Sequence, residues 1–189
     1  MASTTGTRPI LALDVDDVLN PRNTHVASRA EAAGLPPYKH HLYTGPTPTG
    51  DVVNGEVLLN PAHGAWLRDV ADAGVEIVWA TSWGATANAC ICPVFGLPEL
   101  PVIPISLYDS TITWGRVGKF GAVCKYIGDR PLVWVDNAFG GKDLIWAEDR
   151  TAGGIATLIV HVDPAYALTL DDIASVDTWL DALRARAAW

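Results

Sequence analysis

The stretch ILALDVDDVLNP, residues 10–21, places three carboxylates directly after a short apolar run. Continuous apolar residues predict a strand that is covered on both faces. Side chains two residues apart project the same way from extended backbone, so Asp14 and Asp16 are expected to point together. Like charges held that close favour a shared proton or a bound cation. The stretch therefore predicts a buried strand that ends at a site for a cation or a reacting phosphate, with Asp17 in a supporting position.

Further apolar runs recur along the chain, with helical periodicity between most of them. The runs are VEIVWAT (75–81), LPVIPIS (100–106), PLVWVD (131–136) and ATLIVHV (156–162). Their continuous hydrophobicity is typical of parallel strands that are buried on both faces. The alternation of strands and helices predicts a three-layer α/β sandwich around a mainly parallel, five-stranded sheet.

The expected helices carry recognisable end signals. Asn60 precedes Pro61 at the start of the first helix, and Gly74 follows its end. Thr169 and Asp172 form a cap-like pair at the start of the last helix. These signals predict helices over about 60–74 and 169–188, and a further periodic stretch predicts one over 119–128.

Two segments do not fit simple strand-to-helix connections. Residues 21–59 are far longer than the usual loop of a few residues, and such loops are usually functional. Within them YKHHLYT (38–44) and DVVNGEVLLN (51–60) predict two short strands, with Asn54-Gly55 as the turn signal between strands of a hairpin. We expect a small β flap beside the carboxyl edge of the sheet. The second segment, 93–115, is rich in proline and is expected to place a strand between irregular loops.

Length and charge limit the classes of protein. A chain of 189 residues suits one domain, so we expect a single domain over 1–189 with 21–59 as an insertion. Thirteen basic against twenty-one acidic residues give a net charge of −8. Because this charge repels a phosphate backbone at long range, extensive non-specific binding of nucleic acid is not expected. A local basic patch beside a site stays open.

Cysteine usage and hydropathy point to the compartment. Cys90, Cys92 and Cys124 are odd in number and lack paired metal-ligand spacing, so reduced thiols are expected. The first residues are polar, and no apolar run approaches the length that spans a membrane. We expect a cytoplasmic protein without a membrane segment.

Polar residues stand at the ends of several predicted elements. Asp136 ends the run 131–136 and would lie beside Asp14 if the two strands are neighbours. Thr81 closes the run 75–81, and Lys119 opens a helix. Carboxylate oxygens suit hard divalent ions such as Mg²⁺, while hydroxyl and ammonium groups can hold phosphoryl oxygens. These residues predict a site for phosphoryl chemistry at one edge of the sheet.

The order of these motifs resembles a known superfamily. The elements DVDDVLN, WATSW, a lysine at a helix start and WVDN resemble the haloacid dehalogenase-like (HAD) superfamily of aspartyl-phosphate hydrolases. More narrowly, LLNPAHGAWLRDVADAGVEIVWATSW, LPELPVI, WVDN and VDPAYALT resemble the HAD domains associated with bacterial Swiss Army Knife RNA-repair proteins. The resemblance covers essentially the whole chain and implies a Rossmann-like sheet with a minimal cap.

The resemblance also implies roles for individual residues. Asp14 would attack phosphorus to form an aspartyl-phosphate. Asp16 would protonate the leaving oxygen and then activate water, which favours a phosphatase over a dehalogenase. Mg²⁺ would be held by the Asp14 carboxylate, the Asp16 backbone carbonyl and Asp136. Thr81 and Lys119 would hold the phosphoryl oxygens.

Several positions leave alternatives open. Many relatives carry two acids at the last motif, but here the second is Asn137, which supplies an oxygen without a charge. Asp143, seven residues beyond Asp136, is a candidate substitute. Ser82 could take the role of Thr81, and Trp83 could stack on a base or ring.

The functional expectation is a Mg²⁺-dependent phosphomonoester hydrolase. A flap of about 40 residues is too small to roof the site. The site can therefore admit a phosphate at a nucleic-acid end or a nucleotide, and a small-metabolite phosphatase is the competing reading. The reading from another class is a non-catalytic HAD-like binding or accessory protein, which Asn137 favours. Hydrolysis of a generic aryl phosphate separates the two classes.

Overall fold

The computed structural model describes residues 8–23, 25–26, 29, 33–46, 51–105 and 119–186. Part of the segment 93–115, for which we expected irregular loops, falls in 106–118 and lies outside the described residues. No helix in the described ranges combines the length and the apolar character that crossing a membrane requires.

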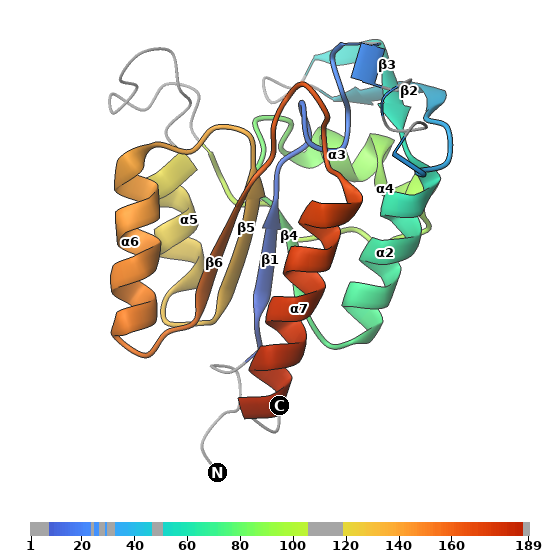
Figure 1. The fold of residues 1–189 in the computed structure, drawn as a ribbon. Coiled ribbons are helices and arrows are strands. Elements are labelled where there is room, and N and C mark those ends of the chain that lie inside the picture. Colours follow the sequence, from blue (N-terminus) through green and yellow to red (C-terminus); the bar gives the residue numbers. More distant parts are fainter. Residues whose placement is uncertain are drawn as a thin grey trace.

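A parallel sheet forms the centre of the molecule (Figure 1). Its strands are β1 (Ile10–Leu13), β4 (Glu76–Trp79), β5 (Leu132–Asp136) and β6 (Thr157–His161), in the order β4-β1-β5-β6. The β1 strand pairs in parallel with β4 on one side and β5 on the other. Its four residues are fully buried. The prediction of an α/β fold with a parallel sheet is therefore confirmed.

The fifth predicted strand, 100–106, is wrong for the described residues of that segment. Val102 forms only an isolated parallel bridge with Trp79, made by the bonds Trp79 N to Pro101 O and Ile103 N to Trp79 O, both 2.9 Å long. The next bond toward the start of the segment would need an N–H group on residue 101, which proline lacks. The apolar content predicts a strand there, but Pro101 prevents the ladder from extending toward the start of the segment.

Helices cover both faces of the sheet (Figure 1). The bounds are α2 (Pro61–Asp72), α3 (Ala85–Cys90), α4 (Cys92–Phe95), α5 (Lys119–Ile127), α6 (Gly141–Ala152) and α7 (Leu170–Arg186). Side chains alternate along each strand, so Leu11 and Leu13 pack with α2 and α7. Ile10 and Ala12 pack with α5 on the opposite face. Three layers result, with a separate apolar cluster on each side of the sheet.

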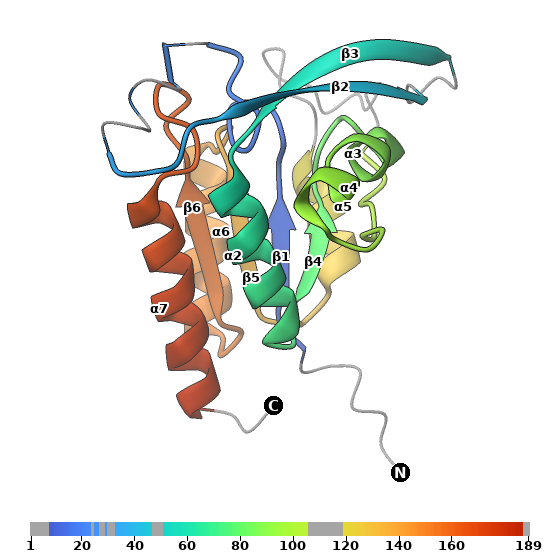
Figure 2. The ribbon, with the colours of Figure 1, turned by 90° about the vertical axis from the view of Figure 1, so that its right-hand side faces the viewer.

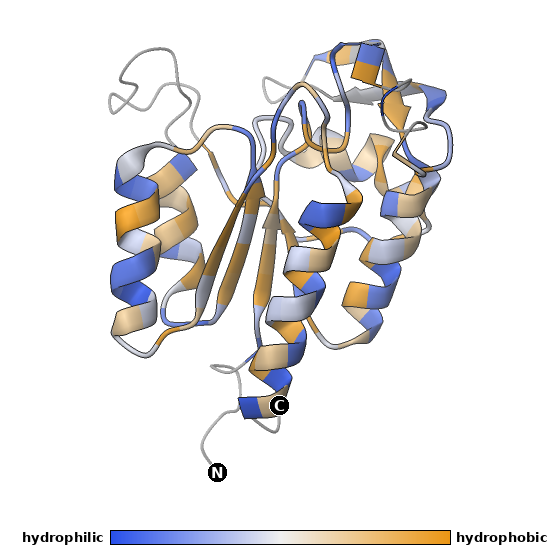
Figure 3. Cartoon of the chain, in the orientation of Figure 1, coloured by the Kyte–Doolittle hydropathy of each residue, from blue (hydrophilic) through white to orange (hydrophobic). Residues whose placement is uncertain are grey.

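Hydropathy follows this layering (Figure 3). The strands are mostly apolar, and the helices alternate apolar and polar residues around their axes. The predicted caps are also present: Asn60 Oδ1 accepts a hydrogen bond from Ala62 N at 2.9 Å, and Asp172 Oδ2 accepts one from Thr169 N at 2.9 Å. These bonds satisfy amide groups that a helix start would otherwise leave without a partner.

A second, two-stranded sheet lies beyond the carboxyl ends of the central strands (Figure 2). The β2 strand (Lys39–Pro46) pairs antiparallel with β3 (Val52–Leu59). We call this pair the β2–β3 ribbon; its action as a flap over the site stays a prediction. In Figure 2 it runs above α2 and α3.

The expected Asn54-Gly55 turn is wrong. Asn54 and Gly55 lie inside β3, opposite Thr44 and Tyr43. A Cβ atom on Gly55 would come within 2.5 Å of the Tyr43 ring, so any larger residue here would require that ring to shift. The same dipeptide that favours tight turns therefore serves a cross-strand packing contact.

Candidate functional site

Three of the predicted site residues meet at the carboxyl edge of the sheet. Asp14 follows β1 and Asp136 ends β5, and these strands are direct neighbours. The first residue of α5, Lys119, places its Nζ atom 2.5 Å from Asp14 Oδ2 and 2.8 Å from Asp136 Oδ2. All three side chains are largely buried, with 8%, 2% and 14% of Asp14, Asp136 and Lys119 exposed. The structure thus brings two carboxylates to one ammonium group.

The backbone holds both carboxylates in a fixed orientation. Asp14 Oδ1 accepts a hydrogen bond from Val15 N at 2.8 Å, and Asp136 Oδ1 accepts one from Ala138 N at 3.0 Å. In each carboxylate the second oxygen, Oδ2, is the one that faces Lys119. Charge-assisted hydrogen bonds of this kind are stronger than neutral ones. The orientation of the two carboxylates is therefore fixed by the backbone as well as by Lys119.

The charges in this cluster do not balance. Burial, followed by the neighbouring charge of Asp14, raises the pKa of Asp136 to about 6, although Lys119 opposes the shift. Burial would lower the pKa of Lys119, but the two carboxylates outweigh it and raise that pKa. Two acids with one cation leave a negative charge in a desolvated place. An additional cation would be bound favourably there.

Asp16 lies beside this cluster in a different environment. Its side chain is partly exposed, and burial is the main cause that raises its pKa. A hydrogen bond from the Trp83 side chain opposes that shift, while the Asp14 charge adds to it. An acid whose pKa is shifted toward neutrality can both donate and accept a proton. The environments of Asp14 and Asp16 thus differ, as distinct roles require.

The loop after β1 is a tight turn around one carbonyl group. Val15 O accepts hydrogen bonds from the amides of Val18, Leu19 and Asn20. Asp17 adopts a left-handed conformation with φ of 58°. Its carboxylate accepts a 2.8 Å hydrogen bond from Arg22 Nε. Asp17 therefore holds the turn, in agreement with the supporting role that we expected.

Thr81 and Ser82 follow β4 at the same edge. Ala80 N donates to Leu13 O at 2.9 Å, which places the end of β4 next to the residue before Asp14. Thr81 is buried, and its Oγ1 atom accepts a long hydrogen bond of 3.4 Å from Trp83 N. Ser82 is partly exposed. The position of Thr81 is compatible with phosphate binding, which stays a prediction.

The two auxiliary candidates lie on other elements. Asn137 follows Asp136 directly, and its backbone carbonyl lies 3.2 Å from His161 Nε2. Asp143 sits in the first turn of α6, where its Oδ2 atom accepts a 2.6 Å hydrogen bond from Gly140 N. The carboxylate of Asp143 is therefore engaged in capping α6.

Two residues of the site region were missed by sequence reasoning. Asn20 Nδ2 donates to Asp16 Oδ1 at 3.4 Å, and Asn20 Oδ1 accepts from Leu58 N at 2.9 Å, which ties the loop to β3. The Tyr43 ring lies 5.6 Å from the Trp83 ring. The bridge between Asp16 and Asn20 forms only when the loop after β1 folds into its turn. No sequence pattern signals this contact.

The donor set is suited to a hard divalent cation. Asp14 and Asp136 offer carboxylate oxygens, and the backbone carbonyl of Asp16 belongs to the same loop. Within the described ranges, no three His, Cys, Asp or Glu side chains form a group that could hold a metal ion. Two carboxylates with backbone and water oxygens match the usual surroundings of Mg²⁺. The residues thus fit the cation that the resemblance implies.

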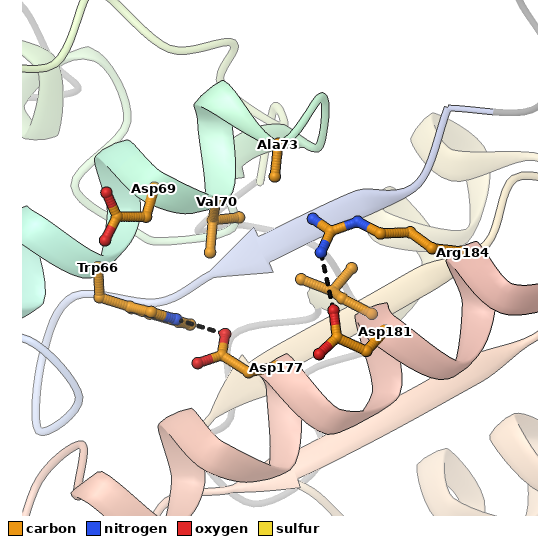
Figure 4. Close-up of a pocket in the computed structure, with 8 residues that line it drawn as sticks. Trp66, Asp69, Val70, Ala73, Asp177, Asp181 and Arg184 are labelled. Atoms are coloured by element: carbon orange, nitrogen blue, oxygen red, sulfur yellow. Dashed lines mark hydrogen bonds and ion pairs between the residues drawn. The ribbon is translucent and has the colours of Figure 1, made fainter.

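A groove of about 280 Å³ lies elsewhere, between α2 and α7 (Figure 4). Trp66 Nε1 donates to Asp177 Oδ1 across it at 2.9 Å, and Arg184 pairs with Asp181 at its end. None of the candidate site residues lines this groove. Its contacts join two packed helices, so the size of this groove does not indicate where the candidate functional site lies.

Comparison with known proteins identifies the family. The model of a family described as the HAD domain in Swiss Army Knife RNA repair proteins matches residues 10–173, a range that includes Asp14, Lys119 and Asp136. No curated protein and no solved structure matches the chain. HAD domains in general are hydrolases and phosphatases. The chain therefore belongs to the HAD domain family of Swiss Army Knife RNA repair proteins.

Proposed function

We propose that this HAD domain is a Mg²⁺-dependent phosphomonoester hydrolase that acts through an aspartyl-phosphate on Asp14. The observation that carries the proposal is the pair of buried carboxylates, Asp14 and Asp136, held on one Lys119 ammonium group at the carboxyl edge of the sheet. Open α/β sheets bind their ligands at this edge. Carboxylates and an ammonium at these positions supply a nucleophile and a counter-charge for a transferring phosphoryl group.

The proposed reaction has two steps. In the first, the Asp14 carboxylate attacks phosphorus, the bond to the leaving oxygen breaks, and Asp16 gives its proton to that oxygen. In the second, Asp16 as carboxylate takes a proton from water, the water oxygen attacks phosphorus, and Asp14 leaves with release of inorganic phosphate. Lys119 neutralises charge on the phosphoryl oxygens in both steps. Bound Mg²⁺, held by Asp14, Asp136 and the Asp16 carbonyl, would supply further neutralisation of that charge.

The remaining candidates have secondary parts in this proposal. Thr81, or Ser82 in its place, donates a hydrogen bond to a phosphoryl oxygen. Asn137 orients a water molecule near the cation through its side-chain oxygen. Asp143 is kept as an auxiliary ligand only in the case that α6 loses its cap, because its carboxylate bonds Gly140 N.

The substrate is proposed from the size of the ribbon above the site. Two eight-residue strands leave less cover than a roofed domain, so a bulky phosphate ester can reach Asp14. A nucleotide or a phosphate at a nucleic-acid end is the proposed substrate class. A small-metabolite phosphatase is the competing assignment.

The decisive experiment is hydrolysis of an aryl phosphate by the purified protein with Mg²⁺. Asp14→Asn is expected to lower kcat by about 10³-fold or more, because removing a nucleophile eliminates the covalent route. Asp149→Asn, an exposed carboxylate on α6, is the matched control and should retain wild-type turnover. Circular dichroism checks that both variants fold. Wild-type turnover in Asp14→Asn would refute the mechanism.

The alternative of a non-catalytic binding or accessory protein is favoured by one residue, Asn137, which replaces a charged ligand. It predicts no hydrolysis by the wild-type protein with Mg²⁺, Mn²⁺ or Ca²⁺. Under the enzymatic proposal, turnover stops when EDTA removes the divalent cation and returns when Mg²⁺ is added back. The two readings are separated by that one assay.

A further inference from the structure

A basic groove lies beneath the β2–β3 ribbon, apart from the groove between α2 and α7. It has a volume of about 250 Å³ and lies where β2 meets α2 and α4. Its charged and titratable lining residues are Lys39, His41 and Arg68, and its floor includes the apolar side chains of Leu59 and Phe95. None of its lining residues is acidic. Figure 2 shows β2 passing above α2 and α4.

The charge of this groove is opposite to that of the whole chain. The chain carries a net charge of −8, whereas the fixed charges in the groove are both positive. In the described ranges, neither Lys39 nor Arg68 forms an ion pair with a carboxylate; Arg68 Nη1 donates instead to Phe95 O. Positive groups in a concave, partly apolar surface attract anions more strongly than the same groups on a flat surface.

The ribbon connects this groove to the candidate active site. Side chains at alternate positions of a strand share a face, so Lys39, His41 and Tyr43 project from the same side of β2. Tyr43 contacts Trp83, and the Trp83 side chain hydrogen-bonds the Asp16 carboxylate. One face of β2 therefore leads from the aromatic pair beside Asp16 to His41 and then to Lys39. Each two-residue step along the strand covers about 7 Å.

We propose that the groove of Lys39, His41 and Arg68 binds the phosphodiester backbone of a single-stranded nucleic acid whose terminal phosphate lies at Asp14. This inference rests on the proposed phosphatase function. Sites that hold single strands combine a positive groove, which follows the backbone, with aromatic rings on which bases stack. Tyr43 and Trp83 supply the rings, and the groove supplies the positive charge. The groove would then explain how an acidic protein accepts a polyanionic substrate at one place.

Steady-state kinetics with three substrates test the proposal. The substrates are an oligonucleotide of about eight nucleotides with a terminal phosphate, the matching mononucleotide and an aryl phosphate. We expect a higher kcat/KM for the oligonucleotide than for the mononucleotide. In the double variant Lys39→Gln/Arg68→Gln this preference should fall about tenfold, because KM for the oligonucleotide rises. Lys142→Gln, an exposed lysine on α6, is the matched control and should leave the preference unchanged.

The salt dependence of oligonucleotide affinity adds a second measurement. A substitution that only disturbed the fold would not change this dependence. Each phosphate contact to a single strand contributes about −0.7 to the slope of log affinity against log salt concentration. The double variant should flatten that slope by about one unit for the oligonucleotide. Because Arg68 also bonds Phe95 O, Lys39→Gln alone serves if the double variant fails to fold, and it should lower the preference about threefold.

A binding measurement separates this inference from the proposed catalysis. Fluorescence anisotropy with a labelled oligonucleotide that lacks a terminal phosphate reports the groove even if the protein hydrolyses nothing. Weaker binding by the double variant would then support the groove while the phosphatase proposal fails. Equal affinity of the wild type and the double variant for the oligonucleotide would overturn the nucleic-acid site. So would polyglutamate of the same charge that displaces the labelled oligonucleotide as well as the unlabelled oligonucleotide does.

Discussion

The edge of the central sheet and the β2–β3 ribbon hold their functional residues in different ways. Asp14 follows β1 and Asp136 ends β5, both strands are buried on both faces, and each carboxylate accepts a hydrogen bond from a backbone amide. Among the residues that the structure describes, the ribbon strands pair only with each other, and several of their side chains are exposed. The ribbon is joined to the site through Asn20 and through the Tyr43 contact with Trp83. The proposed chemistry would thus rest on buried elements, and the proposed substrate contacts on a more exposed one.

Replacing Lys119 should have a large effect on activity, because it breaks the rigid side of this comparison. Lys119→Met leaves two carboxylates without their shared cation, so kcat/KM for an aryl phosphate should fall by about 10²-fold to 10³-fold. The loss of this cation should also raise the pKa of Asp136 further, since Lys119 lowers it. Lys125→Met, exposed on the same helix, is the control. A comparable loss of activity in both variants would contradict the assignment.

A second prediction concerns the pH dependence of stability in the body of the fold. His63 is fully buried, its Nε2 atom lies 3.0 Å from Leu168 O, and burial lowers its pKa from 6.5 to about 4. The unfolded chain therefore takes up the proton first as the pH falls. The stability that the neutral ring contributes is present above pH 6.5 and is lost toward pH 4, by about 3 kcal/mol in all.

Urea unfolding at several pH values checks this prediction. The free energy of unfolding of the wild type should fall by about 2 kcal/mol more between pH 7 and pH 5 than that of His63→Gln, which cannot titrate. The comparison uses the slope with pH, because the substitution also changes packing at one pH. Parallel slopes in the two proteins would show that His63 does not control acid sensitivity.

The same substitution in a core helix and in the ribbon gives a direct test of the difference between the body of the fold and the ribbon. A Cβ atom on Gly64 in α2 would lie 2.6 Å from the ring of Phe95, which is buried in the core. Overpacking of this kind costs about 1–3 kcal/mol, partly offset by the better helix propensity of alanine. Gly64→Ala should therefore lower the global free energy of unfolding by about 1–2 kcal/mol in urea denaturation.

Gly55→Ala should have the smaller effect on global stability. Its Cβ atom would lie 2.5 Å from the Tyr43 ring, but that ring is on the partly exposed ribbon and can move. Hydrogen exchange of the β2 and β3 amides should become faster, while the global unfolding free energy changes by less than about 1 kcal/mol. Equal global losses in Gly55→Ala and Gly64→Ala would remove the distinction between the two regions.

Much of the rigid region could be predicted from the sequence, and much of the ribbon could not. Asp14 and Asp136 follow from a simple rule, because parallel strands bring their carboxyl ends to one edge, and Lys119 was expected from its place at a helix start. Local preference predicts a turn at Asn54-Gly55, because it cannot show that Tyr43 lies across this dipeptide from the neighbouring strand. Pro101 already weighs against a paired strand because it lacks an N–H group, but the hydrogen bond that it removes is known only from the contact with Trp79. Asn20 joins Asp16 to β3 through a contact that no periodicity encodes.

The central place of β1 has a consequence for when the protein becomes competent. Ile10 pairs with Glu76 on one side and with Leu132 on the other, so the strand that leads into the proposed nucleophile, Asp14, must wait for partners far along the chain. Pairings between distant segments close large loops and are slow to form. During synthesis, Asp14 therefore stays without Lys119 and Asp136 until most of the chain has been made. A nascent chain should thus pass through most of its production without hydrolysing phosphate esters.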